Sequence, residues 1–268
     1  MDKQIFYPKI SIITITYNSE KTVEETIQSV VSQDYPNLEY LIIDGGSKDS
    51  TLNIVEKYKD KISFLISEPD KGISDAFNKG IRYATGDIIG IINSDDLLLP
   101  GSLKAIAEHY EPKVGVYRGN LIVWNEETNM KVLAVTSIKH SPYSFKRHVC
   151  HPSTFITKKT YDQYGGYKID FKYMMDDDIL ARLYVNGVVF KLVNRELAVF
   201  RLGGTTNNSY KKKLGELERF YIENGCSKIY AKFRVLLFRL YNISMGLAAK
   251  LIPMDVLRKV KYKSITAK

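Results

Sequence analysis

The segment from Gly86 to Asp96, GDIIGIINSDD, constrains the fold of this chain more than any other. Its isoleucines flank Gly90 in a short apolar run, which is typical of a strand buried on both faces of a sheet. The strand ends abruptly in Asn93-Ser94-Asp95-Asp96, and buried carboxylates are costly unless they are paired or coordinate a metal. At the end of a central strand such a pair indicates a site where a divalent cation and a phosphate meet. The structural alternative is that Asp95 and Asp96 open the next turn and cap a following helix.

Strand and helix patterns alternate through the first hundred residues. We expect strands at 10–16, 40–43, 62–67 and 88–92, and helices at 21–33, 50–58 and 74–84, the first capped by Asn18 or Ser19. This alternation predicts an α/β fold with a mainly parallel sheet and helices on both faces. Right-handed crossovers place the loops after these strands on one edge of the sheet, where such sheets bind ligands.

The remainder of the chain divides into a mixed segment and a helical tail. We expect short strands at 119–124, 131–135, 153–156 and 188–192, a helix at 176–185, and helices from Lys211 onward. Composition shifts around residues 203–213. We therefore predict a domain at 1–205, with halves at about 8–100 and 101–205, and an appendage at 206–268.

Positive charge is concentrated in that appendage. Residues 1–202 carry 25 lysines and arginines against 26 acidic residues, whereas residues 203–268 carry 14 against 4. This asymmetry indicates a polyanionic partner. No nucleic-acid recognition motif accompanies it, so we expect a membrane surface and no nucleic acid.

The stretch 228–252 has apolar residues at helical spacing, interrupted by lysines and arginines. This favours a helix that lies in a membrane interface over one that spans the bilayer. The alternative is an amphipathic helix packed on the body of the protein. Only two cysteines are present and no secretory leader is recognisable, so we expect a cytoplasmic protein.

The run Asp176-Asp177-Asp178 follows two methionines and opens a predicted helix. Acidic residues complement the dipole at a helix N-terminus, which explains at least two of them structurally. Carboxylates this close also favour a proton on one of them, which suits a general base. We expect one catalytic and two structural residues.

The motifs SIITITYNSEKTVEETIQSVVSQDYPNLEYLIIDGGSKDST, SEPDKGISDAFNKGI and ATGDIIGIINSDD, followed by the acidic run, resemble the family 2 glycosyltransferases of the GT-A fold. The resemblance covers about residues 8–205. It is strongest to bacterial members that build the O-antigen of lipopolysaccharide, capsule or exopolysaccharide. It implies a catalytic domain in which a Rossmann-like central sheet binds a nucleotide-sugar donor.

Carried over by position, the resemblance implies the site residues. The nucleotide pocket comprises Thr16, Tyr17, Asn18, Asp44 on the base, Asp70, Lys71, Asn93, Ser94 and Asp96. Because Asn93 replaces the first carboxylate of the family's DxD motif, Asp95 is the implied ligand of Mn²⁺ or Mg²⁺. Asp176 falls at the catalytic base position, but Met175 stands where the family often has Glu, so Asp177 and Asp178 remain alternatives. These two and His151 are candidate acceptor contacts.

The implied reaction is an inverting, metal-dependent transfer of a hexose or N-acetylhexosamine, in a single in-line displacement. The donor is a nucleotide sugar, by expectation UDP-linked, and the acceptor a saccharide on a polyprenyl diphosphate at the inner face of the bacterial cytoplasmic membrane. The alternatives are a nucleotidyltransferase or a non-catalytic nucleotide-sugar-binding protein. A nucleotidyltransferase would need a glycine-rich basic loop after the first strand, and Thr16-Tyr17-Asn18-Ser19 is not one.

Overall fold

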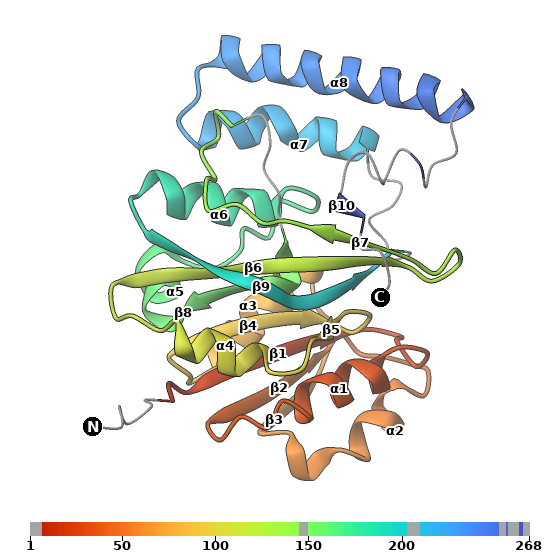
Figure 1. The fold of residues 1–268 in the computed structure, drawn as a ribbon, viewed down its shortest axis with the longest axis vertical. Coiled ribbons are helices and arrows are strands. Elements are labelled where there is room, and N and C mark those ends of the chain that lie inside the picture. Colours follow the sequence, from red (N-terminus) through yellow and green to blue (C-terminus); the bar gives the residue numbers. More distant parts are fainter. Residues whose placement is uncertain (1–6, 145–149, 203–209, 252–255, 257–262, 265–268) are drawn as a thin grey trace.

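A computed structural model of the chain describes residues 7–144, 150–202, 210–251, 256 and 263–264 (Figure 1). The strands are β1 (Ile10–Thr16), β2 (Leu38–Asp44), β3 (Phe64–Ser67), β4 (Ile88–Asn93), β5 (Leu97–Leu98), β6 (Val114–Asn125), β7 (Met130–Ala134), β8 (Thr154–Thr157), β9 (Val189–Arg201) and β10 (Lys263–Ser264). The helices are α1 (Val23–Val31), α2 (Thr51–Glu56), α3 (Ile73–Tyr83), α4 (Ser102–Glu108), α5 (Lys158–Tyr164), α6 (Met175–Val185), α7 (Tyr210–Glu223) and α8 (Lys228–Leu251). Two short 3₁₀ helices, η1 (Lys59–Lys61) and η2 (His151–Ser153), complete the set.

The strands form one mixed sheet in the order β10-β7-β6-β8-β4-β1-β2-β3. The four strands β4, β1, β2 and β3 are parallel, as the alternating pattern predicts, and β8, β6 and β7 continue the sheet antiparallel. Strand β9 lies off this path and pairs with both β6 and β5. The mixed α/β fold with helices on both faces of the parallel strands confirms the expected class.

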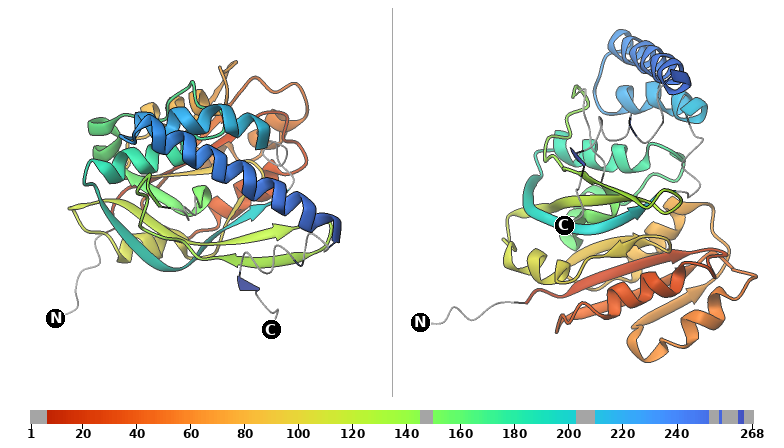
Figure 2. Two further views of the ribbon diagram at one scale, coloured as in Figure 1. Left: turned by 90° about the horizontal axis from the view of Figure 1, so that it is seen from above. Right: turned by 45° about the vertical axis from the view of Figure 1, so that its right-hand side comes forward.

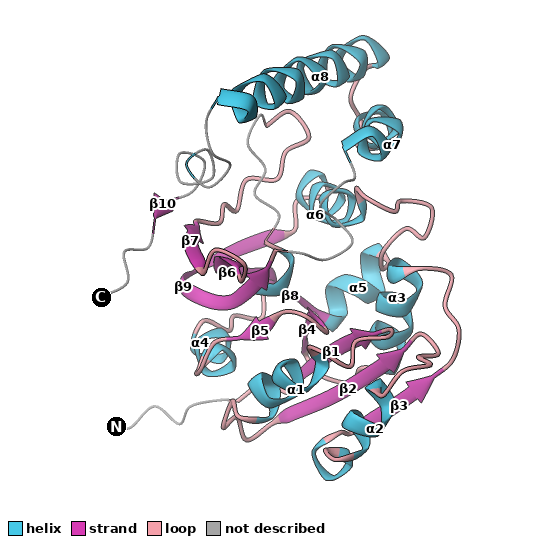
Figure 3. Ribbon diagram, turned by 90° about the vertical axis from the view of Figure 1, so that its right-hand side faces the viewer, coloured by secondary structure: helices cyan, strands magenta, loops and turns pink. Residues whose placement is uncertain are grey.

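Two apolar cores lie on opposite faces of the parallel strands. Figure 3 shows α1 on one side of these strands and α3 on the other. Isoleucines of β1 and β2, together with Tyr40 and Leu41 of β2, point to α1, α2 and α4 on one face and to α3 on the other, because side chains alternate along a strand. The second core continues through α5 and α6 to Leu217 and Phe220 of α7. Helices α6, α7 and α8 are therefore stacked in successive layers on that side (Figures 1 and 2).

Several elements differ from the sequence expectations. Strand β9 runs through Arg201 rather than ending at Leu192, and its pairing with β6 shifts register near Gly119 and Asn120. This irregularity coincides with the polar residues Asn194-Arg195-Glu196, which hide the strand in the sequence. Helices α4 and α5 and strand β5 were not expected at all.

The structure contradicts the expected cap of α1, and also the structural alternative in which Asp95 and Asp96 cap a helix. Helix α1 begins after Thr22, which makes no side-chain capping hydrogen bond, and Asn18 instead has φ 47° and accepts a hydrogen bond from the Lys48 N–H at 2.8 Å. The Asp95-Asp96 pair is followed by strand β5, and α4 begins only at Ser102 after Gly101. These carboxylates therefore cap no helix.

Residues 210–223 and 228–251 of the tail are helical, as expected, and residues 263–264 form the short strand β10. The predicted domain boundary at 205/206 lies outside the described residues. None of the described helices combines the length and apolar character needed to cross a bilayer.

Candidate active site

The parallel strands bring four loops to one edge of the sheet. Thr16 of β1 pairs in register with Asp44 of β2, Asp44 with Ser67 of β3, and Ile15 with Asn93 of β4. The loops that follow these strands carry the nucleotide-pocket candidates. The loops lie side by side because the paired strands are parallel and end at the same level of the sheet.

Asp44 lies at the centre of this row and is fully buried. Its Oδ2 accepts hydrogen bonds from the N–H groups of Gly46 and Ser47, at 3.0 and 2.9 Å, and from the Ser67 hydroxyl at 2.6 Å. The Ser47 hydroxyl donates to its Oδ1. A buried carboxylate needs such donors, and these tie the loop after β2 to β3.

The surface beside Asp44 is formed by Tyr17 and Asp70. Tyr17 is 61% exposed at the end of β1. A Cβ placed on Gly45 would approach Asp70 Oδ2 to 2.6 Å and the Tyr17 ring to 3.3 Å, so any side chain there would displace the Asp70 carboxylate. Asp70 Oδ1 accepts from the Gly72 N–H at 2.8 Å, and Lys71 is exposed next to it. Tyr17 and Asp70 thus flank one exposed surface over the loop that Asp44 organises.

The loop after β4 has one buried and one partly exposed carboxylate. Asp96 is fully buried, where its Oδ1 accepts from the Arg201 N–H and its Oδ2 from Asn93 Nδ2, both at 3.3 Å. Burial, followed by the neighbouring charge of Asp95, raises the pKa of Asp96 well above its ordinary value. Asp95 is only partly buried, and desolvation raises its pKa as well. Asp95 is therefore the carboxylate of this pair that a ligand can reach.

The same loop offers some, but not all, of the ligands that a hard cation needs. Among the described residues no group of three or more His, Cys, Asp or Glu is close enough to enclose a metal. Asn93 Oδ1 and Thr16 Oγ1 are, however, buried without a hydrogen-bond partner in the described part of the chain. Mg²⁺-like ions are usually held by one or two carboxylates together with substrate phosphates. Asp95 beside the orphaned Asn93 oxygen fits that mode of binding.

Ser94 connects this loop to the first one. Its Oγ lies 2.7 Å from Ser19 Oγ, while the Asn18 N–H donates to Ser47 Oγ at 2.8 Å. Hydrogen bonds therefore join the loops after β1, β2 and β4 into one rim. Asp49 Oδ1 accepts a hydrogen bond from the Thr51 N–H at 3.0 Å, at the start of α2.

The three aspartates at the start of α6 have different surroundings. Asp178 is buried, with Lys168 Nζ at 3.0 Å, Asn224 Nδ2 at 3.3 Å and Arg182 Nε at 3.5 Å. It joins α6 to α7. The Asp177 charge acts on Arg118, a fully buried residue whose pKa desolvation lowers to about 10.

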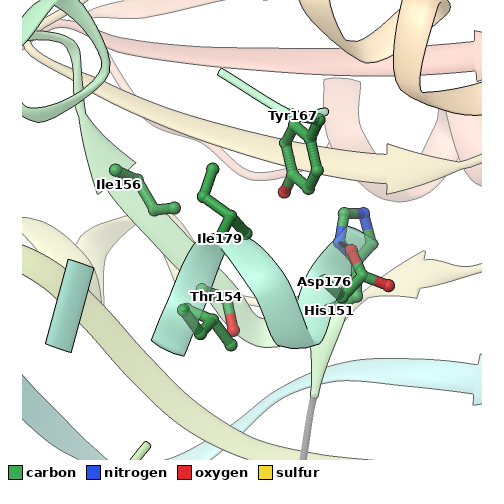
Figure 4. A pocket seen from close by; sticks show the side chains of 7 residues that line it. His151, Thr154, Ile156, Tyr167, Asp176 and Ile179 are labelled. Carbon is green, nitrogen blue, oxygen red and sulfur yellow. Dashed lines mark ion pairs between the residues drawn. The ribbon is translucent and has the colours of Figure 1, made fainter. Parts of the chain in front are cut away.

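Asp176 is the member of this run that meets His151. Its Oδ1 lies 3.0 Å from His151 Nδ1, and its side chain is 28% exposed against 12% for the histidine (Figure 4). His151 lies in η2, which packs against β4. The histidine and Asp176 are thus held next to the strand that ends at Asn93.

Three contributing residues escaped the sequence analysis. Phe77 of α3 stacks on the His151 ring, Arg201 donates to Asp96 from the end of β9, and Arg118 is buried beside the acidic run. Each acts across a long sequence separation and belongs to no local motif. In the sequence, the two arginines could have been noticed only because Arg118 and Arg201 lie within otherwise apolar strands.

Comparison with known proteins identifies the family of this chain. The family model for glycosyl transferase family 2 matches residues 11–182. The putative glycosyltransferase EpsE of Bacillus subtilis is 28% identical over 208 residues, 73% of each chain. A PGL/p-HBAD biosynthesis glycosyltransferase of Mycobacterium bovis is 27% identical over 216 residues, 77% of this chain and 82% of the relative.

Solved structures share the fold. TarS of S. aureus in complex with UDP-GlcNAc superposes with a TM-score of 0.63 at 19% identity, covering 86% of this chain and 71% of TarS. The mannosyltransferase PcManGT of Pyrobaculum calidifontis, in complex with GDP-Man and Mn²⁺, gives 0.62 at 18% identity and covers 96% and 82%. The matched family segment runs from β1 into α6 and includes both the rim of strand-end loops and Asp176. The chain therefore belongs to glycosyl transferase family 2.

Proposed function

We propose that this protein is an inverting glycosyltransferase. It moves a hexosyl or N-acetylhexosaminyl group from a nucleotide sugar to a saccharide carried on a polyprenyl diphosphate, in bacterial surface polysaccharide synthesis. The observation that carries the proposal is the row of strand-end loops with a partly exposed carboxylate, Asp95, on the rim and a second, Asp176, held beside β4. One carboxylate serves the donor diphosphate and the other the acceptor hydroxyl.

The proposed donor is UDP-linked and lies across the loops after β1 to β4. The base rests over the loop that Asp44 organises, with the Tyr17 ring, Asp70 and Lys71 at its edge. Asn18, Ser94 and Asp96 hold the rim in shape through the hydrogen bonds described above. The TarS complex with UDP-GlcNAc, which has the same fold, supports a UDP-sugar.

The proposed metal is Mn²⁺ or Mg²⁺, and Asp95 holds it together with the donor diphosphate. When bound, the ion supplies positive charge that stabilises the leaving nucleoside diphosphate. The orphaned Asn93 oxygen beside Asp95 supports this placement, as does the Mn²⁺ in the PcManGT complex.

Asp176 is the proposed general base, since its carboxylate is the exposed one of a pair with a histidine, whereas Asp178 is engaged by cations. It takes the proton of the acceptor hydroxyl as that oxygen attacks the anomeric carbon. The bond from this carbon to the diphosphate breaks, and its electron pair leaves with the nucleotide. The transfer is a single displacement and forms no covalent intermediate with the protein.

The proposed acceptor lies at a membrane surface, and α8 presents a face suited to one. Ile229, Phe233, Leu236, Leu240, Ile243 and Leu247 follow each other at intervals of four and three residues and are 50–84% exposed. The helix contains lysines and arginines but no acidic residue. Pairing of two copies through this face would bring like charges together, whereas an anionic leaflet would attract each cation by about 1 kcal/mol. We therefore place the protein on the cytoplasmic face of the membrane.

The test is a transfer assay with purified protein, Mn²⁺, a synthetic lipid diphosphate-linked GlcNAc acceptor and a panel of UDP-, GDP- and dTDP-sugars. We expect a metal-dependent product one sugar heavier, lost in Asp95→Ala and Asp176→Ala. If UDP with Mn²⁺ raises the melting temperature but no product forms, the proposed acceptor is wrong and the proposed donor site stands. If no nucleotide binds, the proposed nucleotide site is wrong.

A further inference from the structure

Glu216 of α7 holds the backbone that leads into α6. Its Oε1 accepts a hydrogen bond from the Lys172 N–H at 2.8 Å, and its Oε2 accepts from the N–H groups of Tyr173 and Met174 at 2.8 and 3.0 Å. Met174 is the N-cap of α6 and makes no side-chain capping hydrogen bond of its own. Because the N–H groups at the start of a helix have no acceptor within that helix, a side chain from a different helix supplies the acceptor here.

The convergence of three consecutive N–H groups on one carboxylate requires a defined backbone conformation. Such a concave arrangement of N–H groups favours an anion, and the negative charge of Glu216 also complements the positive end of the α6 dipole. Hydrogen bonds to a charged acceptor are stronger than those between neutral groups. The Glu216 carboxylate therefore sets the direction in which the chain enters α6.

Helix α7 also contacts the chain on either side of Asp176, as expected from its place directly over α6 (Figure 1). Before Asp176, Arg219 of α7 forms an ion pair with Asp170. After it, Asn224 of α7 donates to Oδ1 of the buried Asp178 at 3.3 Å. The first turn of α6 is thus held to α7 from both ends.

Asp176 depends on this support, because no described hydrogen bond fixes its own side chain. Its Oδ1 is buried without a hydrogen-bond partner among the described residues, and the side chain is partly exposed. The position of this carboxylate is therefore given by the helix that carries it. The start of that helix is the backbone that Glu216 holds.

We propose that Glu216 is a positioning residue for Asp176, so that α7 belongs to the catalytic unit. This inference rests on the proposed function. Asp176 lies two residues after Met174, so a shift of the backbone at 172–174 would move the Asp176 carboxylate relative to the acceptor hydroxyl. Glu216 itself touches no reacting atom and takes no proton. The contact lies outside the segment that defines the family, which ends at residue 182.

The kinetic test compares Glu216→Ala with Glu223→Ala. Both remove a carboxylate of α7, but the described partners of Glu223 are the side chains of Lys168 and Arg219, and not the backbone of 172–174. In Glu216→Ala we expect kcat to fall about 10- to 100-fold with KM for the nucleotide sugar within about threefold, because a displacement of about 1 Å can cost about 10²-fold. Glu223→Ala should keep its kcat within about threefold. Glu216→Gln, which keeps one acceptor oxygen, should fall between the parent and Glu216→Ala.

A second test needs no activity. Hydrogen exchange reports directly on the backbone N–H groups of residues 172–174. We expect these groups to exchange faster in Glu216→Ala and at the parent rate in Glu223→Ala. Both measurements can be made on Glu216→Gln if Glu216→Ala does not fold.

Three results would overturn the inference. They are unchanged exchange in Glu216→Ala, a kcat of that variant within about threefold of the parent, and an equal fall of kcat in Glu223→Ala at an equal loss of melting temperature. If no donor supports transfer, the proposed function fails, whereas hydrogen exchange still decides whether Glu216 fixes the start of α6.

Discussion

The Arg201 N–H donates to Oδ1 of Asp96 at 3.3 Å and so joins the end of β9 to the loop after β4. The Arg201 side chain pairs with Glu25 of α1 and lies 3.0 Å from Glu126. Asp96 therefore serves to anchor its loop, and Asp95 is the carboxylate left for a ligand. This division of labour within one Asp-Asp pair underlies the first prediction.

Asp95→Ala should remove Mn²⁺-dependent nucleotide binding while leaving the fold intact, because Asp95 has no described structural partner of the kind that Asp96 has. We expect at least about a tenfold loss of UDP affinity, read as a smaller rise in melting temperature with UDP and Mn²⁺. Asp60→Ala, an exposed carboxylate in η1, is the control. An unchanged rise in Asp95→Ala would contradict the metal assignment.

Asp176→Asn should lower kcat by about 10²- to 10⁴-fold, the usual contribution of a general base. The amide keeps the size of the side chain but accepts no proton. Binding of UDP with Mn²⁺ should be unchanged, since Asp176 faces the acceptor in the proposed complex. Equal activity of the variant and parent in the lipid acceptor assay would move the base to Asp177 or Asp178.

Asp178→Ala should act on stability instead. Its removal leaves the Lys168 and Arg182 charges without their shared carboxylate between α6 and α7. We expect a loss of about 3–5 kcal/mol in the free energy of unfolding, measured by urea denaturation. Asp162→Ala, which removes an exposed ion pair with Lys158 on α5, should cost less than about 1 kcal/mol.

Glu39→Gln should destabilise the protein in a pH-dependent way. Desolvation opposes ionisation of Glu39, but hydrogen bonds from Lys9, Ser11 and Thr85 outweigh it and lower its pKa to about 2. Because the pKa of Glu39 in the folded protein lies below its ordinary value of 4.5, the ionised group stabilises the fold above about pH 4.5. That stabilisation is lost as pH falls toward 2.

We therefore expect Glu39→Gln to cost about 1–3 kcal/mol at pH 7. The difference from the parent should shrink between pH 4.5 and 2, measured by denaturant unfolding at several pH values. A difference that stays constant over this range would show that the charge of Glu39 contributes nothing.

Leu236→Glu with Leu240→Glu should weaken attachment to membranes, because both side chains lie on the exposed apolar face of α8. Flotation with vesicles containing phosphatidylglycerol should recover the parent protein and lose most of it in the variant. Binding of the parent should fall with salt, since charges contribute. Leu65→Glu, an exposed leucine on β3, is the matched control. A parent protein found as a dimer that the α8 substitutions dissociate would assign this face to a second copy.

Local pattern determined much of the fold. The alternation of strand and helix signals in residues 10–92 correctly placed β1 to β4, with α1 to α3 between them, since burial on both faces of a parallel sheet demands continuous apolar strands. The parallel order then followed from chain connectivity, and with it the row of strand ends at Thr16, Asp44, Ser67 and Asn93. These features depend only on local sequence patterns and on the right-handedness of the crossover connections between parallel strands.

Tertiary structure decided the roles within each acidic cluster. Sequence placed Asp95 with Asp96, and Asp176 with Asp177 and Asp178, but only packing buried Asp96 under Arg201 of β9, surrounded Asp178 with Lys168 and Arg182, and set Asp176 against His151. Adjacent residues on a helix or turn point in different directions, and what each meets comes from segments far away in the chain. The sequence by itself therefore determined which residues gather at the site, and the tertiary contacts determined which oxygen is free to react.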